Sequence, residues 1–157
     1  MLKEEKSIFA LCRPPGHHAS KDQYGGYCFF NNVAIAAEKL IEEGAKKIAI
    51  LDIDFHHGNG TQEIFYNDET VAYGSSHEFP LFPGTGSEEE TGVGNIFNAP
   101  LKAGIKGKEF LKIFEQKVLN PIDKFKPEII LISAGFDAHI RDPLAGINLE
   151  SKDFYEI

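Results

Sequence analysis

Residues 47–57 read Lys-Ile-Ala-Ile-Leu-Asp-Ile-Asp-Phe-His-His, and this stretch decides the fold. It begins with a continuous apolar run at residues 48–51, which is typical of a strand buried on both faces of a parallel sheet. Asp52, Asp54 and His56 then alternate with apolar residues. Residues two apart in an extended segment point to the same side, so these three side chains are expected to share one face. The stretch therefore predicts a buried strand that ends in a cluster of acidic and imidazole groups.

Further strands and helices alternate on both sides of this stretch. Helical spacing of apolar residues predicts helices, and short apolar runs predict strands. The expected helices are residues 29–43, 59–66, 108–125 and 151–157, and the expected strands are residues 7–12, 47–53, 71–74 and 128–133. Residues 77–95 are rich in Gly and Pro and are expected to form a long loop. The alternation predicts an α/β fold with a mostly parallel sheet flanked by helices.

The composition is that of an ordinary globular domain. The chain has 157 residues, of which 42% are apolar and 25% charged, enough for one domain with a sizeable core. Its net charge of −8 argues against nucleic-acid binding, which leaves a basic footprint, and is compatible with a cationic substrate. The sequence shows neither a membrane-spanning apolar run nor a signal-peptide pattern, so we expect no membrane contact and a reducing, cytoplasmic location.

Polar clusters follow the predicted strands at residues 16–18, 52–57 and 137–142. The carboxyl ends of parallel strands line the ligand crevice of an open sheet, so these clusters are expected to meet. Asp54 and His56, with Asp137 as the natural third ligand, suit Zn²⁺ or another transition metal at a catalytic site. The simpler alternative is that the strand-end aspartates cap the next helix. That is common for a single Asp and much less so for an Asp-x-Asp-x-His-His run.

His17 and His18 form an adjacent pair in a loop bounded by Gly and Pro. By themselves they could be a solvated surface pair. Beside a metal, however, an imidazole can take a proton from water and return one to a leaving group near neutral pH. Asp52 is then free to orient one of the two rings. The pair therefore predicts proton transfer in a metal-assisted hydrolysis.

Five motifs, in this order, resemble the histone deacetylase family, which includes acetylpolyamine amidohydrolases and bacterial acetoin-utilisation proteins. They are Arg-Pro-Pro-Gly-His-His-Ala at 13–19, Gly-Tyr-Cys-Phe-Phe-Asn-Asn at 26–32, Leu-Asp-Ile-Asp-Phe-His-His-Gly-Asn-Gly-Thr at 51–61, Phe-Pro-Gly-Thr-Gly at 82–86 and Ser-Ala-Gly-Phe-Asp-Ala-His at 133–139. The third motif has Asn59 where other relatives have an Asp, and in this it is more similar to the class II and bacterial branch of the family. The resemblance implies an arginase/deacetylase-like fold and removal of acetyl groups from acetyl-lysine or acetylated polyamines.

The resemblance also implies a ligand set. Zinc would be held by Asp54, His56 and Asp137. A structural monovalent cation of the K⁺ type would bind near Asp52, Asp54, His56 and Ser75, partly through backbone carbonyls.

The resemblance implies different roles for His17 and His18. His18 would act first as general base and then as general acid, while His17 would stay an electrostatic partner hydrogen-bonded to Asp52. Many relatives orient the second histidine with an aspartate. Here Asn59 stands at that position, so a neutral amide would do the same work and the basicity of His18 would differ.

The substrate tunnel of the family has two aromatic walls, which match Tyr27 and Phe82 here. Tyr27 departs from the more usual Phe, and Gly26 would permit close approach to the substrate. The family's oxyanion donor is a Tyr in a Gly-rich segment well downstream of the last zinc ligand. No tyrosine of this chain matches that segment; the tyrosines are Tyr24, Tyr27, Tyr66, Tyr73 and Tyr155.

The motifs cover nearly the whole chain but only the middle of a family domain. We therefore expect residues 1–157 to be the central portion of one deacetylase-like domain, incomplete at both ends. The alternative to an active metal-dependent deacetylase is a truncated or split metal-binding fragment that is inactive alone and self-associates or needs a companion chain. An arginase-like binuclear manganese hydrolase shares the fold, but it would need additional carboxylates and lacks the adjacent histidines.

Overall fold

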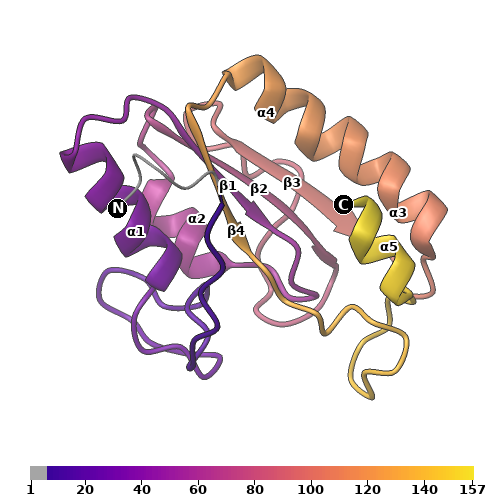
Figure 1. Cartoon of the computed structure of the whole chain (residues 1–157). Coiled ribbons are helices and arrows are strands. Elements are labelled where there is room, and N and C mark those ends of the chain that lie inside the picture. Colours follow the sequence, from indigo (N-terminus) through magenta and orange to yellow (C-terminus); the bar gives the residue numbers. More distant parts are fainter. Residues whose placement is uncertain (1–6) are drawn as a thin grey trace.

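A computed structural model describes residues 7–157 as a layer of strands between two layers of helices (Figure 1). The strands are β1 (Ile48–Asp52), β2 (Val71–Glu78), β3 (Ile96–Leu101) and β4 (Ile129–Ser133). They pair in the order β3-β2-β1-β4, and every pairing is parallel. The predicted α/β class with a parallel sheet is therefore confirmed.

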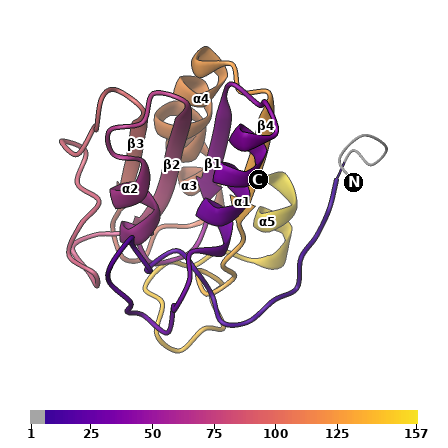
Figure 2. The same ribbon diagram turned by 90° about the vertical axis from the view of Figure 1, so that its left-hand side faces the viewer.

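Helices lie on both faces of the sheet (Figures 1 and 2). One face carries α1 (Asn32–Glu42) and α2 (Asn59–Phe65), and the other carries α5 (Ser151–Glu156) and a long run of α3 (Gly107–Phe114), η1 (Glu115–Leu119) and α4 (Asn120–Phe125). The side chains of β1 alternate between two hydrophobic cores. Ile48 and Ile50 pack in the core on the α1 side, while Ala49 and Leu51 pack in the core on the α3 side. Burial on both faces explains the continuous apolar run of this strand.

The predicted strand at residues 7–12 is wrong. Those residues have no strand partner and are exposed, and Leu11 is 91% exposed. In Figure 2 the segment runs away from the sheet. An isolated extended segment gains no ladder hydrogen bonds, so apolar composition alone does not make it a strand.

The sheet also contains a strand that the sequence did not predict. β3 lies within Asn-Ile-Phe-Asn-Ala-Pro-Leu at residues 95–101, where Asn98 and Pro100 read as loop residues. Pro100 is tolerated because β3 lies at the edge of the sheet, where one side of its backbone needs no strand partner. β2 is likewise longer than predicted, and its last residues enter the segment that was expected to be loop.

The predicted helix over residues 108–125 is continuous but not uniform. Its middle turn is a π-helix, in which the Asn120 N–H donates to the Glu115 carbonyl. The next residue, Pro121, has no N–H to donate and its ring crowds the carbonyl four residues earlier. The wider turn accommodates this proline without breaking the helix.

Among residues 7–157, no helix combines the length and the apolar character needed to cross a bilayer. The cytoplasmic location stays a prediction.

The close contact between β2 and the π-turn gives a stability prediction. A Cβ at Gly74 would lie 2.5 Å from Cγ1 of Val118, which is fully buried. We expect Gly74→Ala to lower the free energy of unfolding by about 1–3 kcal/mol, because the core must shift to admit the methyl group. Urea unfolding measures this. Gly25→Ala is the control, since a Cβ there meets nothing within 4 Å. Equal midpoints for the two variants would contradict the packing described here.

Candidate metal and acid–base site

The site begins where β1 and β4 end next to each other. Asp52 and Ser133 are register partners, so the chain leaves both strands at the same edge of the sheet. Two hydrogen bonds then join the outgoing segments: Ile53 N–H to the Ser133 carbonyl at 3.1 Å, and Phe55 N–H to Asp137 Oδ1 at 2.8 Å. These bonds fix the loop after β4 against the loop after β1.

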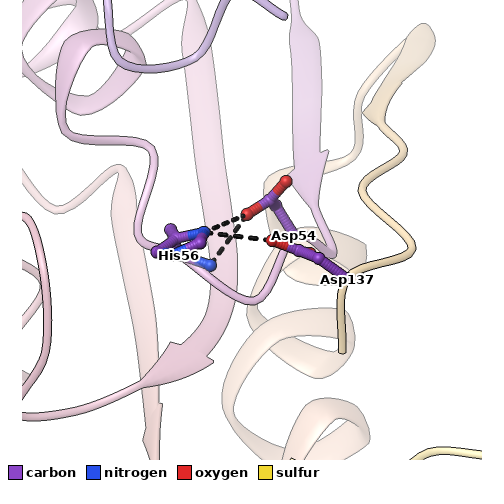
Figure 3. A group of neighbouring side chains, drawn as sticks. All are labelled: Asp54, His56 and Asp137. Atoms are coloured by element: carbon purple, nitrogen blue, oxygen red, sulfur yellow. Dashed lines mark hydrogen bonds and ion pairs between the residues drawn. The ribbon is translucent and has the colours of Figure 1, made fainter. Parts of the chain in front are cut away.

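Asp54, His56 and Asp137 form a compact cluster of potential metal ligands (Figure 3). One ligand atom from each lies within 4.8 Å of the others. His56 Nδ1 is 3.2 Å from Asp54 Oδ1 and 3.0 Å from Asp137 Oδ2. All three side chains are only partly buried, which leaves the cluster open on one side. Gly135 makes room for it, because a Cβ there would lie 2.1 Å from Asp54 Oδ2.

The charges of this cluster call for a cation. Hydrogen bonds to Asp137 and then Asp54 raise the pKa of His56 to about 10 and outweigh the opposing effect of burial. Two carboxylates facing each other favour a positive charge between them, which the protonated His56 supplies here and a bound metal ion would supply in place of that proton. Two carboxylate oxygens and an imidazole nitrogen are a donor set that fits Zn²⁺ or a similar transition-metal ion.

The paired histidines lie beside the cluster in a loop that is anchored to two helices. Asn31, the N-cap of α1, donates from Nδ2 to the Ala19 carbonyl at 3.0 Å. The backbone N–H of Thr61, in α2, donates to the His17 carbonyl at 3.1 Å. Both rings are buried, and their centroids are 4.0 Å apart. The loop thus delivers His17 and His18 to the end of β1 in a fixed orientation.

Each histidine has its own oxygen partner. His17 Nδ1 donates to Asp52 Oδ2 at 2.9 Å, and His18 Nδ1 donates to Asn59 Oδ1 at 2.8 Å. His17 Nε2 lies 3.8 Å from Asp54 Oδ1, so the pair borders the ligand cluster directly. Because Nδ1 of a neutral His18 carries the proton, its Nε2 has a free lone pair.

The two rings have opposite protonation preferences. Burial is the largest effect on His17 and lowers its pKa, but Asp52, Asp54 and Asp137 together raise the pKa to about 9. Burial and then the charge of His17 lower the pKa of His18. These surroundings favour the protonated form of His17 and the neutral form of His18, and a neutral imidazole is the form that can accept a proton.

A buried tyrosine that the sequence did not single out completes the surroundings of Asp52. Tyr73 donates its hydroxyl proton to Asp52 Oδ2 at 3.1 Å and accepts the Gly58 N–H at 3.1 Å. Gly58 is required there, because a Cβ would lie 2.3 Å from Asp52 Oδ2. Tyr73 therefore acts on the fully buried Asp52 and does not face the ligand cluster as a donor. Its position on the same face of β2 as Ser75 and His77 was the available sequence signal.

Gly26 and Phe82 lie against the histidines. Gly26 has φ +52°, and a Cβ there would lie 2.1 Å from His18 Cδ2. The Phe82 ring centroid is 5.2 Å from that of His18 and 6.2 Å from that of His56. Tyr27, by contrast, is 89% exposed, and within residues 7–157 it makes no ring contact with these groups. Its place in a tunnel wall stays a prediction.

The structure thus brings together nearly all of the predicted site residues. They are His17, His18, Gly26, Asp52, Asp54, His56, Asn59, Phe82 and Asp137. Ser75 lies beside Asp52 in the sheet register, but its hydroxyl is hydrogen-bonded to His77 Nδ1 at 2.9 Å. A monovalent cation near these residues stays a prediction.

Known proteins are similar to this chain both in sequence and in fold. A probable deacetylase of Archaeoglobus fulgidus is 43% identical over 99% of this chain and 44% of its own length. The acetylpolyamine amidohydrolase of Mycoplana ramosa is 45% identical over 95% of this chain and 46% of its own length. The crystal structure of acetylpolyamine aminohydrolase from Burkholderia pseudomallei superposes with a TM-score of 0.89, at 38% identity, over 94% of this chain and 44% of that one. The expected arginase/deacetylase-like fold is confirmed by this match.

The chain spans about half the length of the curated relatives that it matches. Over its own length, however, the match is complete, because the family profile described as the histone deacetylase domain spans residues 1–157. The motifs, the fold and the alignment agree, and the chain belongs to the histone deacetylase family.

Proposed function

We propose that this chain carries the metal-binding and proton-transferring part of a deacetylase that acts on acetylated amines. The supporting observation is that the paired His17 and His18 directly border the ligand cluster of Asp54, His56 and Asp137. An ion site and a neutral imidazole base next to each other are what hydrolysis of an unreactive amide requires. A relative named acetylpolyamine amidohydrolase supports acetyl groups as the target.

Asp54, His56 and Asp137 would hold Zn²⁺ in this proposal. When bound, such an ion supplies polarisation of the acetyl carbonyl and a lowered pKa of water. The Phe55 N–H occupies Asp137 Oδ1 and leaves Oδ2 toward His56, which fixes the direction in which Asp137 offers its free oxygen.

His18 would move the proton. Its Nε2 accepts a proton from the attacking water, and the ring later returns that proton to the nitrogen of the departing amine. The immediate products are acetic acid and the free amine, so atoms and charges balance, and the acid then passes its proton to the amine to leave acetate and an ammonium ion. Asn59 holds the ring by Nδ1 throughout, and the His17 cation, fixed by Asp52, stabilises negative charge that develops nearby.

The acetyl group would enter beside Phe82 and over Gly26, with Tyr27 on the opposite wall. Acetyl-lysine and acetylated polyamines both present a slender aliphatic chain to such an entrance. The net charge of −8 favours substrates with a positive charge away from the acetyl group.

A second candidate is a metal-binding chain that hydrolyses poorly by itself and works with a companion chain or as a self-associated form. It is favoured by the outer strand β4, whose Ile130 and Ile132 are more than half exposed. Strands of parallel sheets are ordinarily covered on both faces. Normal turnover by a monodisperse monomer would exclude this candidate, and zinc binding without turnover would favour it.

The first prediction concerns metal affinity. We expect Asp137→Ala to weaken Zn²⁺ binding by more than about 100-fold, because losing a ligand costs more than losing an outer-shell partner. Competition with a chromophoric chelator and metal analysis of the purified protein measure this. Asp142→Ala is the matched control, since the Asp142 carboxylate accepts the nearby Leu144 N–H and does not belong to the ligand cluster. Equal affinities for the two variants would remove Asp137 from the site.

The second prediction concerns His18 itself. We expect His18→Ala to lower kcat/KM by about 100-fold to 10,000-fold, the range for loss of a general base, while the bound zinc is retained. A fluorogenic acetyl-lysine peptide and an acetylated diamine serve as substrates. Loss of zinc together with activity would instead mean that His18 supports the ligand cluster.

The third prediction concerns the partner of His18. In Asn59→Asp a carboxylate replaces the amide at 2.8 Å from Nδ1, which should raise the pKa of His18. The base must be unprotonated to work, so the acidic limb of the pH dependence of kcat/KM should move to higher pH. Asn67→Asp, at an exposed position, is the control for the added charge. An unmoved acidic limb would show that His18 is not the titrating base.

A further inference from the structure

The segment that carries Phe82 is held by a mostly buried polar network that lies outside the candidate site. The network consists of His57, Gln62, His77 and Glu90, and we call it the Glu90 clamp. It holds the three consecutive residues Thr85, Gly86 and Ser87. Each clamp residue comes from a different part of the chain: the segment after β1, helix α2, strand β2 and the end of the loop itself.

Glu90 is the charged centre of the clamp. Its carboxylate accepts the Gly86 N–H at 3.0 Å and the Ser87 N–H at 3.1 Å, and it also accepts a hydrogen bond from Gln62 Nε2. Backbone and amide donors stabilise the ionised form, and the pKa of Glu90 is lowered although burial opposes this. Hydrogen bonds to an ionised carboxylate are stronger than those between neutral groups, so this residue dominates the conformation of the loop.

Gln62 connects Glu90 to the segment that carries the metal ligands. Its Oε1 accepts from His57 Nε2 at 3.1 Å and from Asn98 Nδ2 at 2.7 Å. The opposite nitrogen of His57, Nδ1, then accepts the Thr85 hydroxyl at 2.8 Å. His57 directly follows the ligand His56. Gln62 and His57 are both buried, and their partners fix which atom of each side chain donates a hydrogen bond and which accepts one.

His77 closes the network from β2. Its Nε2 donates to the Gly86 carbonyl at 2.9 Å, and its Nδ1 accepts from Ser75. Gly86 has φ +96°, and a Cβ there would lie 2.3 Å from His77 Nε2. The peptide on both sides of Gly86 is therefore held, its N–H by Glu90 and its carbonyl by His77. A residue gripped in this way cannot shift without breaking several buried hydrogen bonds.

Besides the clamp, a turn restrains Phe82, because the Gly84 N–H donates to the Leu81 carbonyl at 2.7 Å. The Phe82 side chain is 55% exposed, and its neighbour Leu81 is also exposed, so packing alone does not fix the ring over His18 and His56. The clamp holds residues 85–87, which directly follow this turn, and so it holds the C-terminal end of the segment that carries Phe82. The segment of Phe82 is therefore held by residues other than the candidate metal ligands Asp54, His56 and Asp137.

We propose that Glu90 is a positioning residue that, through Gln62 and the Gly86–Ser87 backbone, sets the distance between Phe82 and the acid–base pair and thereby the fit of the acyl group. The inference rests on the proposed function for its effect on substrate, whereas the holding of the loop does not depend on it. Glu90 touches neither the substrate site nor the ligand cluster, so its effect is on fit and not on the chemical step.

A neutral substitution tests the network with almost no change in shape. In Glu90→Gln one oxygen can still accept from Gly86 and Ser87, but the new NH₂ group then faces the NH₂ group of Gln62. Gln62 can turn over to relieve this conflict, and it then presents NH₂ to His57 Nε2 and Asn98 Nδ2, which are both donors. While His57 keeps its proton on Nε2, every arrangement of the two amides leaves donors facing each other, either at Gln62, at His57 and Asn98, or at the Gly86 and Ser87 N–H groups.

The reciprocal variant makes the test specific. In Gln62→Glu combined with Glu90→Gln, the carboxylate at position 62 accepts from His57, from Asn98 and from the amide at position 90. The oxygen of that amide again accepts from Gly86 and Ser87. Gln62→Glu alone places two carboxylates face to face. The two single variants should therefore be impaired and the double variant should recover, which simple loss of stability at either position would not produce.

Two measurements report on the loop without requiring turnover. The first is hydrogen exchange at the amides of Gly86 and Ser87, which should be faster by at least about tenfold in Glu90→Gln once the charge-assisted bonds are lost. The second is the emission of Phe82→Trp, because the chain contains no tryptophan of its own. The emission should move to longer wavelength in the Glu90→Gln background. Glu89→Gln is the matched control, an exposed acid in the same run.

A third measurement reports on the substrate site in protein that keeps Phe82. With the acetyl-lysine peptide as substrate, Glu90→Gln should raise KM by about tenfold and change kcat little, as expected when binding is lost equally in the ground state and the transition state. Zinc content should equal that of the parent. The swapped double variant should return KM toward the parent value.

The outcomes are distinct. Faster exchange, shifted emission and recovery in the double variant support the clamp. Unchanged exchange and emission in Glu90→Gln, or the same changes in Glu89→Gln, overturn it. If the parent hydrolyses no acetylated amine, the proposed function fails, while exchange, emission and the swap still decide whether Glu90 holds Phe82. A fall in kcat with unchanged KM would overturn the assignment of Glu90 to fit.

Discussion

Parallel pairing of β1 with β4 aligns Asp52 with Ser133, and the polar residues that follow the two strands therefore emerge side by side. Everything in the candidate site depends on that alignment. The Phe55 N–H to Asp137 hydrogen bond extends the register beyond the strands and turns two separate chain segments into one set of ligands. The register is enforced by burial, because every residue of β1 lies inside and a shift of one residue would turn apolar side chains toward the wrong core.

This arrangement brings the carboxylates of Asp52, Asp54 and Asp137 close together, and their different surroundings give them different roles. Asp52 is fully buried and saturated by His17, Tyr73 and the Asp54 N–H, so it serves to hold a neighbour. Asp54 and Asp137 keep partial exposure and face His56, so they remain available to a cation. Glycines allow the crowding, since side chains at Gly58 and Gly135 would occupy the space of the carboxylate oxygens.

Much of the site could be predicted because its residues occur in short local patterns. The run Asp52, Asp54 and His56 after β1 and the position of Asp137 after another strand indicated the ligand cluster, although residues 54–56 form bends and not the extended segment that the alternation assumed. The roles of Tyr73 and of the Glu90 clamp were not predicted, because each depends on a partner remote in the chain. Tyr73 binds Asp52, and Glu90 binds Gln62. Tyr73 reads as a core aromatic of a strand and Glu90 as one of a run of surface acids. The strand at residues 7–12 failed for a related reason, since apolar composition cannot show whether a pairing partner is present.

The sequence by itself determined the fold class, the family resemblance and which residues are candidate metal ligands and paired histidines. Local periodicity and residue chemistry are properties of neighbouring positions, and they can be read without knowing what lies across the sheet. Only the tertiary structure decided the strand order, the π-turn that accommodates Pro121, the division of protonation between His17 and His18, and the network that holds Phe82. Those features depend on distances and burial between residues remote in the chain, and pKa shifts and hydrogen-bond partners exist only once such distances are set.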